Sequence, residues 1–507
     1  MRGLTRPRTH RLPLALGAAA LSAVVLAGVA QTAGAKAPPR GWTPPALLAA
    51  AQANPDASFR VIVRGQPGDS SAVIAAAFQQ NADVHGHVGH QFVSINGVSG
   101  TLSGAELTRL VRNPHVLSIV PDAPVLASGV EESTLWRGAT TADQVPSLLG
   151  QAPGAQAPAI AIVDSGIDAT KTQDFGNRIV ANVNLSSDNP NATGDDEGHG
   201  TMVAGIAAGA SAAYPGVLPT APIVSIRTAA ANGASHTSDV IAAVDWILQN
   251  KGTYNIRVAN FSLVSEAASS FVVDPLDAAV EQLWFNGIVV VAAIGNYGQA
   301  GGVKITHAPG NDPFVISVGA LDTNGTVGPA DDFAAPWSAY GHTGDGFAKP
   351  ELSAPGRWIV APVPDGSAFA TAAPDRIVTP GYMWMSGTSL AAPVVSGAAA
   401  AVLALHPDWT PGQVKGALMR SASALPGITG WAGGVGEVNA AAALGLQSAP
   451  NADAGLDRFV VPSTSGGLVF DGNGWEQTVQ SATDWSATDW SATDWSATDW
   501  SAAQLWP

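Results

Sequence analysis

The chain contains no cysteine among its 507 residues, so disulfides, zinc–thiolate sites and a cysteine nucleophile are excluded. Charged residues are also scarce, at 12% against 46% hydrophobic residues, which leaves enough apolar material for a sizeable core. Positive charge is the scarcer sign, because 23 Lys and Arg stand against 39 Asp and Glu and the net charge is −16. This acidic balance argues against nucleic acid as the main partner.

The N-terminus has the pattern of an export signal. Four arginines precede an apolar run at residues 12–30, and Ala33-Gly34-Ala35 offers a small-residue cleavage site. An uncleaved membrane anchor would share the apolar run, but Pro13 and the Ala-x-Ala triplet favour removal after about Ala35. We therefore expect residues 1–35 to be a signal peptide, residues 36–57 a linker, and the protein to be secreted, either extracellular or associated with the cell envelope.

The C-terminus carries a short tandem repeat. The pentapeptide Ser-Ala-Thr-Asp-Trp occurs four times between Ser481 and Trp500. Tryptophans five residues apart share neither one face of a strand nor one stripe of a helix. We interpret residues 446–507 as a low-complexity tail. It is either a disordered acidic tail or an aromatic tail that contacts a wall polymer or another partner in the cell envelope.

Residues 58–126 predict a small α+β unit of order β-α-β-β-α-β, which is the order of the ferredoxin-like split βαβ fold. Ser103 and Glu106 have the spacing of a capping box and predict the start of the second helix. The expected strands are residues 59–63, 84–88, 92–98 and 116–120, and the expected helices are residues 71–79 and 103–111.

The region 127–445 predicts an α/β domain with a doubly wound, mostly parallel sheet. Its strand candidates are continuous apolar runs that alternate with helical segments, which indicates a sheet covered on both faces. In such sheets reactive groups gather at the carboxyl ends of the strands. The expected strands are residues 160–163, 224–226, 258–263, 288–293 and 315–318, and the expected helices are residues 238–250 and 275–286.

Three short motifs in this domain carry reactive side chains. Asp164 ends an expected strand in AIVDSGI, and His199 stands between two glycines in GHGT. Ser389 lies in MSGTSLAAPVVSG, where Pro393 fits the first turn of a helix and its unpaired N–H groups. Each motif alone has a simpler reading, because an Asp can cap a turn, GHGT can start a helix and a Ser can cap one.

Together the motifs meet the needs of acyl transfer. A serine hydroxyl is a poor nucleophile until an imidazole takes its proton, and the imidazole needs a carboxylate to fix its tautomer. The developing oxyanion needs donors that are already in place. The Ser389 N–H is one candidate, and Asn296 in AAIGN is another, although it could also be an ordinary turn asparagine.

These blocks resemble the subtilisin-type serine peptidases of the subtilase family. The matching stretches are AIVDSGI, GHGTMVAGIAAG, AAIGN and GTSLAAPVVSG, in that family's Asp…His…Ser order, and the resemblance covers roughly residues 157–445. It implies a serine endopeptidase in which Asp164 orients the base and His199 is the general base. It further implies that Ser389 is the nucleophile and Asn296 the oxyanion donor.

The resemblance also extends to residues 58–126, which are similar to the family's inhibitory, folding-assisting propeptide. It implies a self-inhibited precursor whose own propeptide is an intramolecular inhibitor. Processing is expected between residues 124 and 134, where Val125, Leu126 and Ala127 are small or aliphatic. The other expected partners are protein or peptide substrates.

Peptides bind to members of this family as an added strand, as β-augmentation predicts. Val264 stands where the family usually has glycine, and Ile294 replaces a more usual alanine. We expect these two side chains to restrict bulky residues at P1, the substrate residue before the cleaved bond. The residues expected to bind substrate are Gly233, Ser262, Leu263, Val264 and Gly295.

No cofactor is required for this chemistry, but a structural calcium ion is common in the family. An acidic stretch could supply ligands, yet no loop has an EF-hand pattern and metal ligands stay unassigned. Three histidines near residues 85–90 match no standard zinc pattern, and we interpret them as surface residues. The acidic residues are Asp188, Asp195, Asp196 and Glu197, and the histidines are His85, His87 and His90.

A different class of function stays open on the sequence alone. The chain could be a weakly active or inactive subtilase scaffold that binds the cell envelope through its tryptophan tail. Fold alone does not decide between this reading and the enzyme, because function depends on the site.

Overall fold

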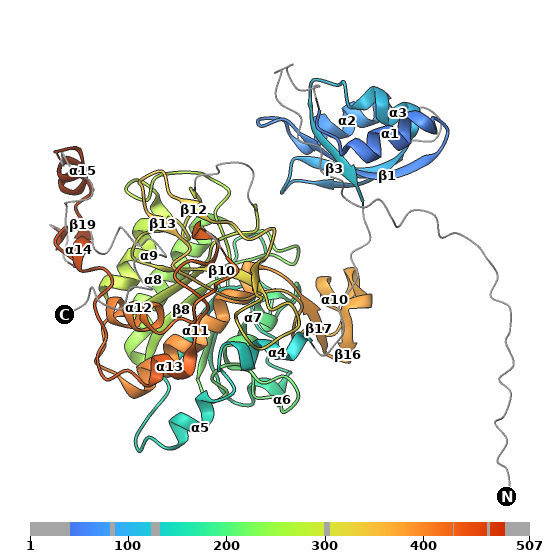
Figure 1. The fold of residues 1–507 in the computed structure, drawn as a ribbon. Coiled ribbons are helices and arrows are strands. Elements are labelled where there is room, and N and C mark those ends of the chain that lie inside the picture. The colour runs from blue at the N-terminus through green and yellow to red at the C-terminus, as the bar shows by residue number, and fades with distance from the viewer. Residues whose placement is uncertain are drawn as a thin grey trace, which may run out of the picture. The chain divides into compact units, whose positions relative to one another are not determined.

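The computed structural model describes residues 41–81, 87–122, 132–298, 305–428, 430–463 and 467–481. The chain divides into two compact units, residues 1–126 and residues 127–507, each of which is described by itself (Figure 1). The predictions for the signal peptide, His85 and the tryptophans of the repeat lie outside the described residues.

The N-terminal unit is a four-stranded antiparallel sheet of order β2-β3-β1-β4 with three helices. The predicted capping box is present, since Ser103 Oγ accepts from the Glu106 N–H at 3.2 Å and Glu106 Oε2 accepts from the Ser103 N–H at 2.6 Å. The elements are α1 (Pro45–Ala53), β1 (Ser58–Gly65), α2 (Ser71–Asn81), β2 (His87–Phe92), β3 (Gly97–Ser103), α3 (Gly104–Leu110) and β4 (Val116–Pro121).

Two predictions for this unit were wrong. The expected strand at residues 92–98 spans a hairpin turn between β2 and β3, in which Asn96 adopts the left-handed φ of 47°. The expected linker at residues 36–57 contains α1, which packs on α3 and fully buries Ala51. Burial of this apolar helix face makes the segment from Gly41 onward part of the unit.

The second unit contains an eight-stranded sheet of order β11-β10-β9-β8-β5-β7-β6, with β14 also paired to β10. Every pairing is parallel except that of β11, so the predicted mostly parallel sheet is confirmed. The strands are β5 (Ala159–Asp164), β6 (Ile179–Asn184), β7 (Ile223–Arg227), β8 (Ile256–Phe261), β9 (Val289–Ala293), β10 (Ile316–Asp322), β11 (Phe333–Ala334) and β14 (Leu352–Pro355).

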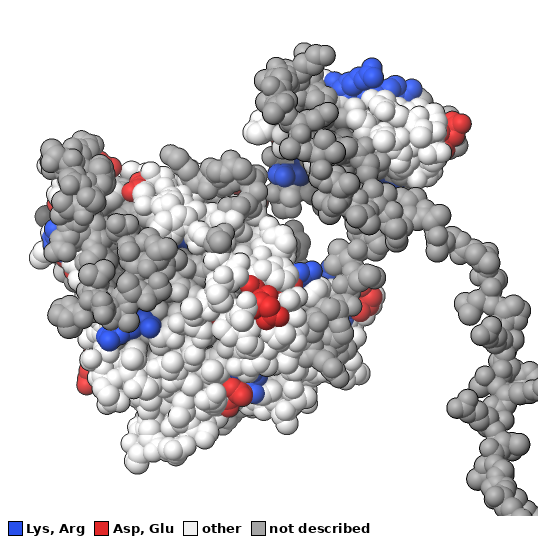
Figure 2. Space-filling view, in the orientation of Figure 1, with Lys and Arg blue, Asp and Glu red and all other residues white. Residues whose placement is uncertain are grey.

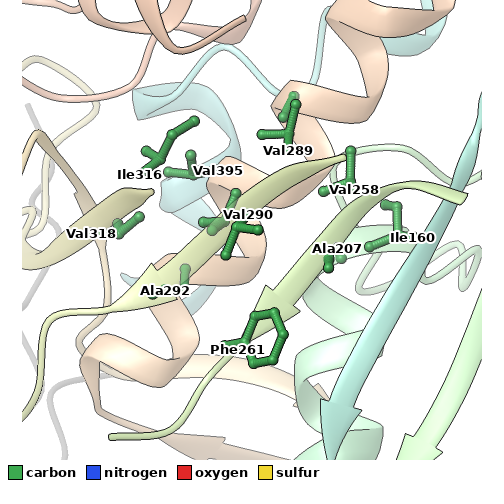
Figure 3. Close-up of a cluster of buried hydrophobic side chains, with 14 of the residues drawn as sticks. Ile160, Ala207, Val258, Phe261, Val289, Val290, Ala292, Ile316, Val318 and Val395 are labelled. Carbon is green, nitrogen blue, oxygen red and sulfur yellow. The ribbon is translucent and has the colours of Figure 1, made fainter. Parts of the chain in front are cut away.

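Helices cover both faces of this sheet, as a parallel sheet requires. The pair α8 (Thr237–Tyr254) and α9 (Pro275–Phe285) packs together against β5, β8 and β9. A second pair, α7 (His199–Ala208) and α11 (Thr388–Leu405), packs together against the sheet through β5, β8, β9 and β10. Apolar side chains such as Val290, Ile316 and Val395 fill the layer between sheet and helices (Figure 3).

By length and composition, α11 is the one helix in the described residues that could cross a membrane. It is 89% buried inside the unit, which is the setting of a core helix. The surface around this core carries few charged side chains on the face that Figure 2 shows, in keeping with the low charged content of the chain.

The segment after residue 445 is folded further than we predicted. It forms α14 (Ala454–Asp457), β18 (Val460–Pro462), β19 (Leu468–Phe470) and α15 (Gly472–Ser481). Trp475 is 5% exposed and contacts the ring of Phe271 at 5.4 Å between centroids. The expected tail therefore starts too early at residue 446, because aromatic side chains up to Trp475 belong to the main core.

The remaining elements are short and lie mainly in loops of the second unit. They are α4 (Glu132–Ala139), α5 (Val145–Gly150), α6 (Thr172–Phe175), β12 (Gly341–His342), β13 (Ala348–Lys349), β15 (Ile359–Pro362), α10 (Ala368–Ala372), η1 (Pro374–Arg376), β16 (Ile377–Thr379), β17 (Tyr382–Met385), α12 (Pro411–Arg420), η2 (Gly430–Gly433) and α13 (Ala440–Leu444).

Candidate active site

Asp164 and His199 are in direct contact. Asp164 is the last residue of β5 and His199 is the first residue of α7, and His199 Nδ1 lies 2.7 Å from Asp164 Oδ1. The two side chains are 4% and 18% exposed. With Nδ1–H donating to the carboxylate, the lone pair of a neutral imidazole is on Nε2, where it can accept a proton.

Glycines allow α7 to start against the loop that follows Asp164. A β-carbon on Gly200 would lie 2.1 Å from the Gly166 carbonyl oxygen and 3.2 Å from Asp164 Cβ. Gly166 itself has φ of +100°, and a β-carbon there would meet the Gly194 carbonyl at 2.2 Å. The GHGT motif therefore starts a helix, and its glycines also let the histidine lie close to its carboxylate.

Asp195 fixes the first turn of α7, a role that the sequence did not reveal. Its buried carboxylate accepts hydrogen bonds from the Gly198 and Thr201 N–H groups, both at 2.8 Å. It also accepts from Ser165 Oγ at 2.8 Å and Thr201 Oγ1 at 2.6 Å. The four donors tie the turn that carries His199 to the loop after Asp164.

The charges around His199 favour its protonated form. Burial lowers the pKa of the imidazole, but the charge of Asp164 and its hydrogen bond outweigh burial and raise that pKa to about 9. Glu197 and Asp195 add to the rise. Burial in turn raises the pKa of Glu197 to about 7, and burial also raises the pKa of Asp195.

Ser389 lies in the first turn of α11, where backbone N–H groups have no partner within the helix. A β-carbon on Gly387 would lie 2.8 Å from Ser389 Oγ and 3.5 Å from Asn296 Nδ2, so both atoms border the same point in space. Asn296 Oδ1 accepts from the Thr388 N–H at 2.9 Å and from Thr388 Oγ1 at 3.0 Å. These bonds orient the amide and leave Nδ2 free to donate near the serine.

The helices that carry His199 and Ser389 start at the same edge of the sheet. His199 begins α7 beside the carboxyl end of β5, and Ser389 lies beside Asn296, which follows β9. Since α7 and α11 pack against each other, their reactive first turns belong to one region of the molecule. All four predicted catalytic side chains therefore lie at the carboxyl edge of the parallel sheet.

Comparisons with known proteins agree with this geometry. The model of the subtilase family matches residues 155–458, which is more than half of the chain. The chain belongs to the subtilase family. It is 34% identical over 279 residues to serine protease AprX of Bacillus subtilis (strain 168), covering 52% of this chain and 61% of AprX.

Two further relatives cover more of their own length. Subtilisin E of Bacillus subtilis (strain 168) is 30% identical over 359 residues, covering 70% of this chain and 83% of subtilisin E. The protein in a crystal structure of a cold adapted subtilisin-like serine proteinase is 29% identical in sequence to this chain. The match has a TM-score of 0.43 and covers 55% of this chain and 86% of that chain. By family and relatives this subtilase is a serine endopeptidase.

A buried polar chain holds the nucleophile helix of this subtilase in place. Ser262 Oγ donates to the Ser389 carbonyl at 2.7 Å and accepts from Asn260 Nδ2 at 2.9 Å. Asn260 Oδ1 accepts from Ser396 Oγ at 2.8 Å, and Ser396 lies about two helical turns after Ser389 in α11. Ser262 was predicted only as a substrate contact, and the parts played by Asn260 and Ser396 need three-dimensional contacts that no motif announces.

The predicted substrate contacts have different surroundings in the subtilase. Gly233 is exposed with φ of +79°, whereas Gly295 is buried with φ of +107°. Leu263 and Val264 are half-buried. Ile294 is fully buried in a small cluster with Ile305 and Ala339, so it does not narrow a surface pocket as predicted, and only Val264 stays a candidate for that effect.

Three side chains of the acidic stretch have protein partners in the described part of the subtilase. Asp188 pairs with His236 at 3.1 Å, Asp196 pairs with Arg227 at 3.0 Å, and Asp195 accepts the four hydrogen bonds given above. No group of three His, Cys, Asp or Glu side chains within these residues is arranged to hold a metal ion.

The segment between β15 and β17, which contains α10, packs on the segment before His199. The Ala368 N–H donates to the Asp196 carbonyl at 2.8 Å, and the Phe369 N–H donates to the Glu197 carbonyl at 2.9 Å. The Phe369 ring meets the imidazole of His199 edge-on, with centroids 6.0 Å apart. This aromatic contact shields one side of the imidazole, and the sequence gave no sign of it.

Proposed function

We propose that the chain is a secreted endopeptidase, made as a self-inhibited precursor, that hydrolyses peptide bonds with Asp164, His199 and Ser389. The observation that carries the proposal is the 2.7 Å contact between His199 Nδ1 and Asp164 Oδ1 at the start of α7. This contact supplies what a serine nucleophile lacks by itself, an oriented base with a free acceptor nitrogen.

In the first half of the reaction, His199 Nε2 takes the proton of Ser389 Oγ as the oxygen attacks the substrate carbonyl carbon. The carbonyl oxygen becomes negative and accepts hydrogen bonds from Asn296 Nδ2 and the Ser389 N–H. Asp164 stabilises the imidazolium that forms. The proton then passes to the leaving amine, the C–N bond breaks, and an acyl-enzyme remains on Ser389.

In the second half, water replaces the amine. His199 takes a proton from the water as it attacks the ester carbonyl, and the same donors stabilise the second oxyanion. Collapse of this intermediate returns the proton to Ser389 Oγ and releases the carboxylic acid product. None of these steps requires a cofactor.

The precursor part of the proposal is supported by the N-terminal unit. Its β-α-β-β-α-β order after α1 and its position directly before the peptidase unit suit an inhibitory propeptide. Secretion is supported by the arginines, the apolar run and the Ala-x-Ala triplet of residues 1–35. Val264 beside the substrate edge favours small or aliphatic P1 residues over Phe or Tyr.

The test follows the intact mass of the chain from Lys36 over time, together with its reaction with a fluorophosphonate probe. We expect the parent to lose an N-terminal piece of about ninety residues, the length from Lys36 to the end of the first unit at residue 126, and to bind one probe per chain. The Ser389→Ala variant should do neither. Ser421→Ala, which removes a half-buried serine after α12, is the matched control and should behave as the parent.

Absence of both cleavage and labelling in a folded parent would contradict the proposal. The scaffold that binds the cell envelope would then be the better account of the chain. Cleavage that persists in Ser389→Ala would contradict the assignment of the nucleophile instead.

A further inference from the structure

The segment at residues 459–481 lies beyond the part of the chain that the subtilase model matches, which ends at residue 458. It contains β18, β19 and α15, and we call it the C-terminal extension. Gln282 in α9 donates from Nε2 to the Leu468 carbonyl at 2.9 Å. A β-carbon on Gly472 would lie 2.4 Å from Val272 Cγ1. The C-terminal extension therefore packs against α9 and against the loop that precedes this helix.

That loop, at residues 265–274, continues directly from residues 262–264, which are expected to bind substrate. At its start, the Ser265 N–H donates to the Ala308 carbonyl at 2.7 Å. Its next three residues are exposed, so the protein core does not hold their side chains. The position of residues 262–264 therefore depends on how firmly the far end of this loop is held.

Phe271 is the buried anchor at the far end of the loop. Its side chain is 1% exposed, and its ring contacts three rings from other segments of the chain. The centroids lie 5.6 Å from Phe347, 5.4 Å from Phe470 and 5.4 Å from Trp475. Two of these three rings belong to the C-terminal extension. Since such aromatic contacts add to the free energy of apolar burial, the extension stabilises the position of Phe271.

Trp475 holds this cluster together through packing. It stacks on Phe347 with centroids 5.7 Å apart and also contacts Phe271 edge-on. The side chain is 5% exposed, and its Nε1 has no hydrogen-bond partner among the described residues. Removal of the ring would leave a cavity beside Phe271, into which the loop can shift.

A firmly held loop lowers the cost of binding a peptide. A peptide that adds as a strand needs the backbone at residues 262–264 in place, and a loose backbone must be ordered when the peptide binds. The reactive side chains lie on other elements, because Asp164 ends β5, His199 starts α7 and Ser389 lies in α11. Loosening the loop should therefore weaken substrate binding and leave the chemical step unchanged.

We propose that Trp475 is a positioning residue for substrate binding, which acts through Phe271 on the backbone at residues 262–264. The inference rests on the proposed function, because it needs residues 262–264 to hold the peptide. It gives the C-terminal extension a role in the activity of the enzyme.

The experiment measures kcat and KM of the mature enzyme for a peptide that extends on both sides of the cleaved bond. It also measures hydrolysis of p-nitrophenyl acetate, an ester too small to add as a strand. Rates are normalised to the chains that the fluorophosphonate probe labels. Trp475→Ala should raise KM for the peptide about tenfold with kcat unchanged, as expected for lost ground-state binding, and ester hydrolysis should stay within about twofold of the parent. Trp475→Phe, which keeps an aromatic ring, should restore most of the affinity.

Trp136→Ala is the matched control. Trp136 lies in α4 and is 4% exposed, so the same substitution removes an equally buried ring outside the C-terminal extension and the loop. It should lower stability but keep the KM of the parent. Phe271→Leu removes the ring from the side of the loop and should raise KM as Trp475→Ala does. This second variant keeps the test decisive if Trp475→Ala does not fold.

A parental KM in folded Trp475→Ala or in Phe271→Leu would overturn the inference alone. A parallel loss of kcat on the peptide and the ester, or an equal rise of KM in Trp136→Ala, would also overturn it, because either result indicates general damage to the fold. A folded parent that hydrolyses no peptide would overturn the proposed function and the inference with it.

Discussion

Two of the places where the second unit buries charge lie at opposite ends of the strands of its parallel sheet. At the carboxyl edge, Asp164 contacts His199, and the charges of Asp195 and Glu197 also raise the pKa of its imidazole. At the amino end of β10, Glu351 Oε2 accepts from the Ser317 N–H at 2.8 Å and Ser317 Oγ at 2.6 Å. We call this second group, centred on Lys349, Glu351, Lys415 and Asp453, the sealed network.

The sealed network pairs its charges almost completely. Lys349 Nζ lies 2.5 Å from Glu351 Oε1, and Lys415 Nζ lies 3.3 Å from the same oxygen and 3.1 Å from Asp453 Oδ1. Trp284 Nε1 donates to the other oxygen of Asp453 at 3.0 Å. None of the four charged side chains is more than 7% exposed.

The active site has more carboxyl groups than cations, and so does the sealed network once the neighbouring Asp277, Glu281 and Asp312 are counted with it. The two places differ in where the extra protons reside. Next to the sealed network, burial and then Asp312 and Asp277 raise the pKa of Glu281 to about 10, so that carboxyl is neutral. At the active site the proton instead resides on His199, which can exchange it with Ser389 and the substrate. The comparison teaches that access to a reacting atom, more than burial of charge, separates a catalytic network from a structural one.

Breaking the sealed network should have the largest effect on stability. Lys415→Met leaves Asp453 unpaired and removes one of the two cations of Glu351, so we expect a loss of about 3–5 kcal/mol in the free energy of unfolding. Urea unfolding followed by tryptophan fluorescence measures this, in a Ser389→Ala background that prevents self-digestion.

Lys171→Met is the matched control for that substitution. Lys171 pairs at 3.7 Å with Asp365, a side chain that is 84% exposed, so the same change should cost less than about 1 kcal/mol. Equal losses for the two variants would contradict the claim that the buried ion pairs of the sealed network contribute more to stability than a pair with an exposed partner.

A smaller effect is expected from Glu281→Gln, which imitates the neutral carboxyl. Because the pKa of Glu281 is raised from 4.5 to about 10 in the folded protein, the folded state holds a proton that the unfolded state releases. Stability therefore falls as the pH rises across that window. The variant lacks this loss, and we expect it to gain at least about 1 kcal/mol relative to the parent between pH 5 and pH 9.

Thermal unfolding of both proteins at pH 5 and pH 9 checks this, again with Ser389→Ala. Glu266→Gln removes an exposed carboxylate and should leave the pH dependence of the parent unchanged. A Glu281→Gln variant that loses stability on alkalinisation as steeply as the parent would show that Glu281 is ionised at neutral pH.

The strands and helices with a strong apolar pattern could be predicted from the sequence. Residues 160–163 and 238–250 lie within β5 and α8, with boundaries off by a few positions. The hairpin at Asn96-Gly97 was missed because an apolar run hides the turn, although this dipeptide is itself a hairpin signal. The fold of the segment to Trp475 depends on distant partners such as Phe271, which no local pattern reveals.

The residues of the site could be predicted from the sequence where the reactive side chain lies within a short motif. Asp164 and His199 were predicted as partners and lie in contact. The supporting contacts were not, because Asp195 and Asn260 act through residues far away in the sequence, as with the bond between Asn260 and Ser396. The roles of Ser389 and Asn296 remain predictions that the geometry favours.

The linkage between protonation and stability has the same sign at the active site, in a narrower pH window. His199 has a pKa raised from 6.5 to about 9, so its charged contacts stabilise the folded protein fully below pH 6.5. That contribution is lost as the pH rises through about 9. Catalysis needs the neutral imidazole, so activity should increase over the same range in which this contribution disappears.

The most direct test is the pH dependence of kcat/KM of the mature enzyme between pH 5 and pH 11, with a peptide that has no ionisable side chain. Our account predicts that activity rises with a midpoint near pH 9, because the imidazole of His199 loses its proton there. A rise with its midpoint near pH 6.5, as for an unperturbed imidazole, would contradict it.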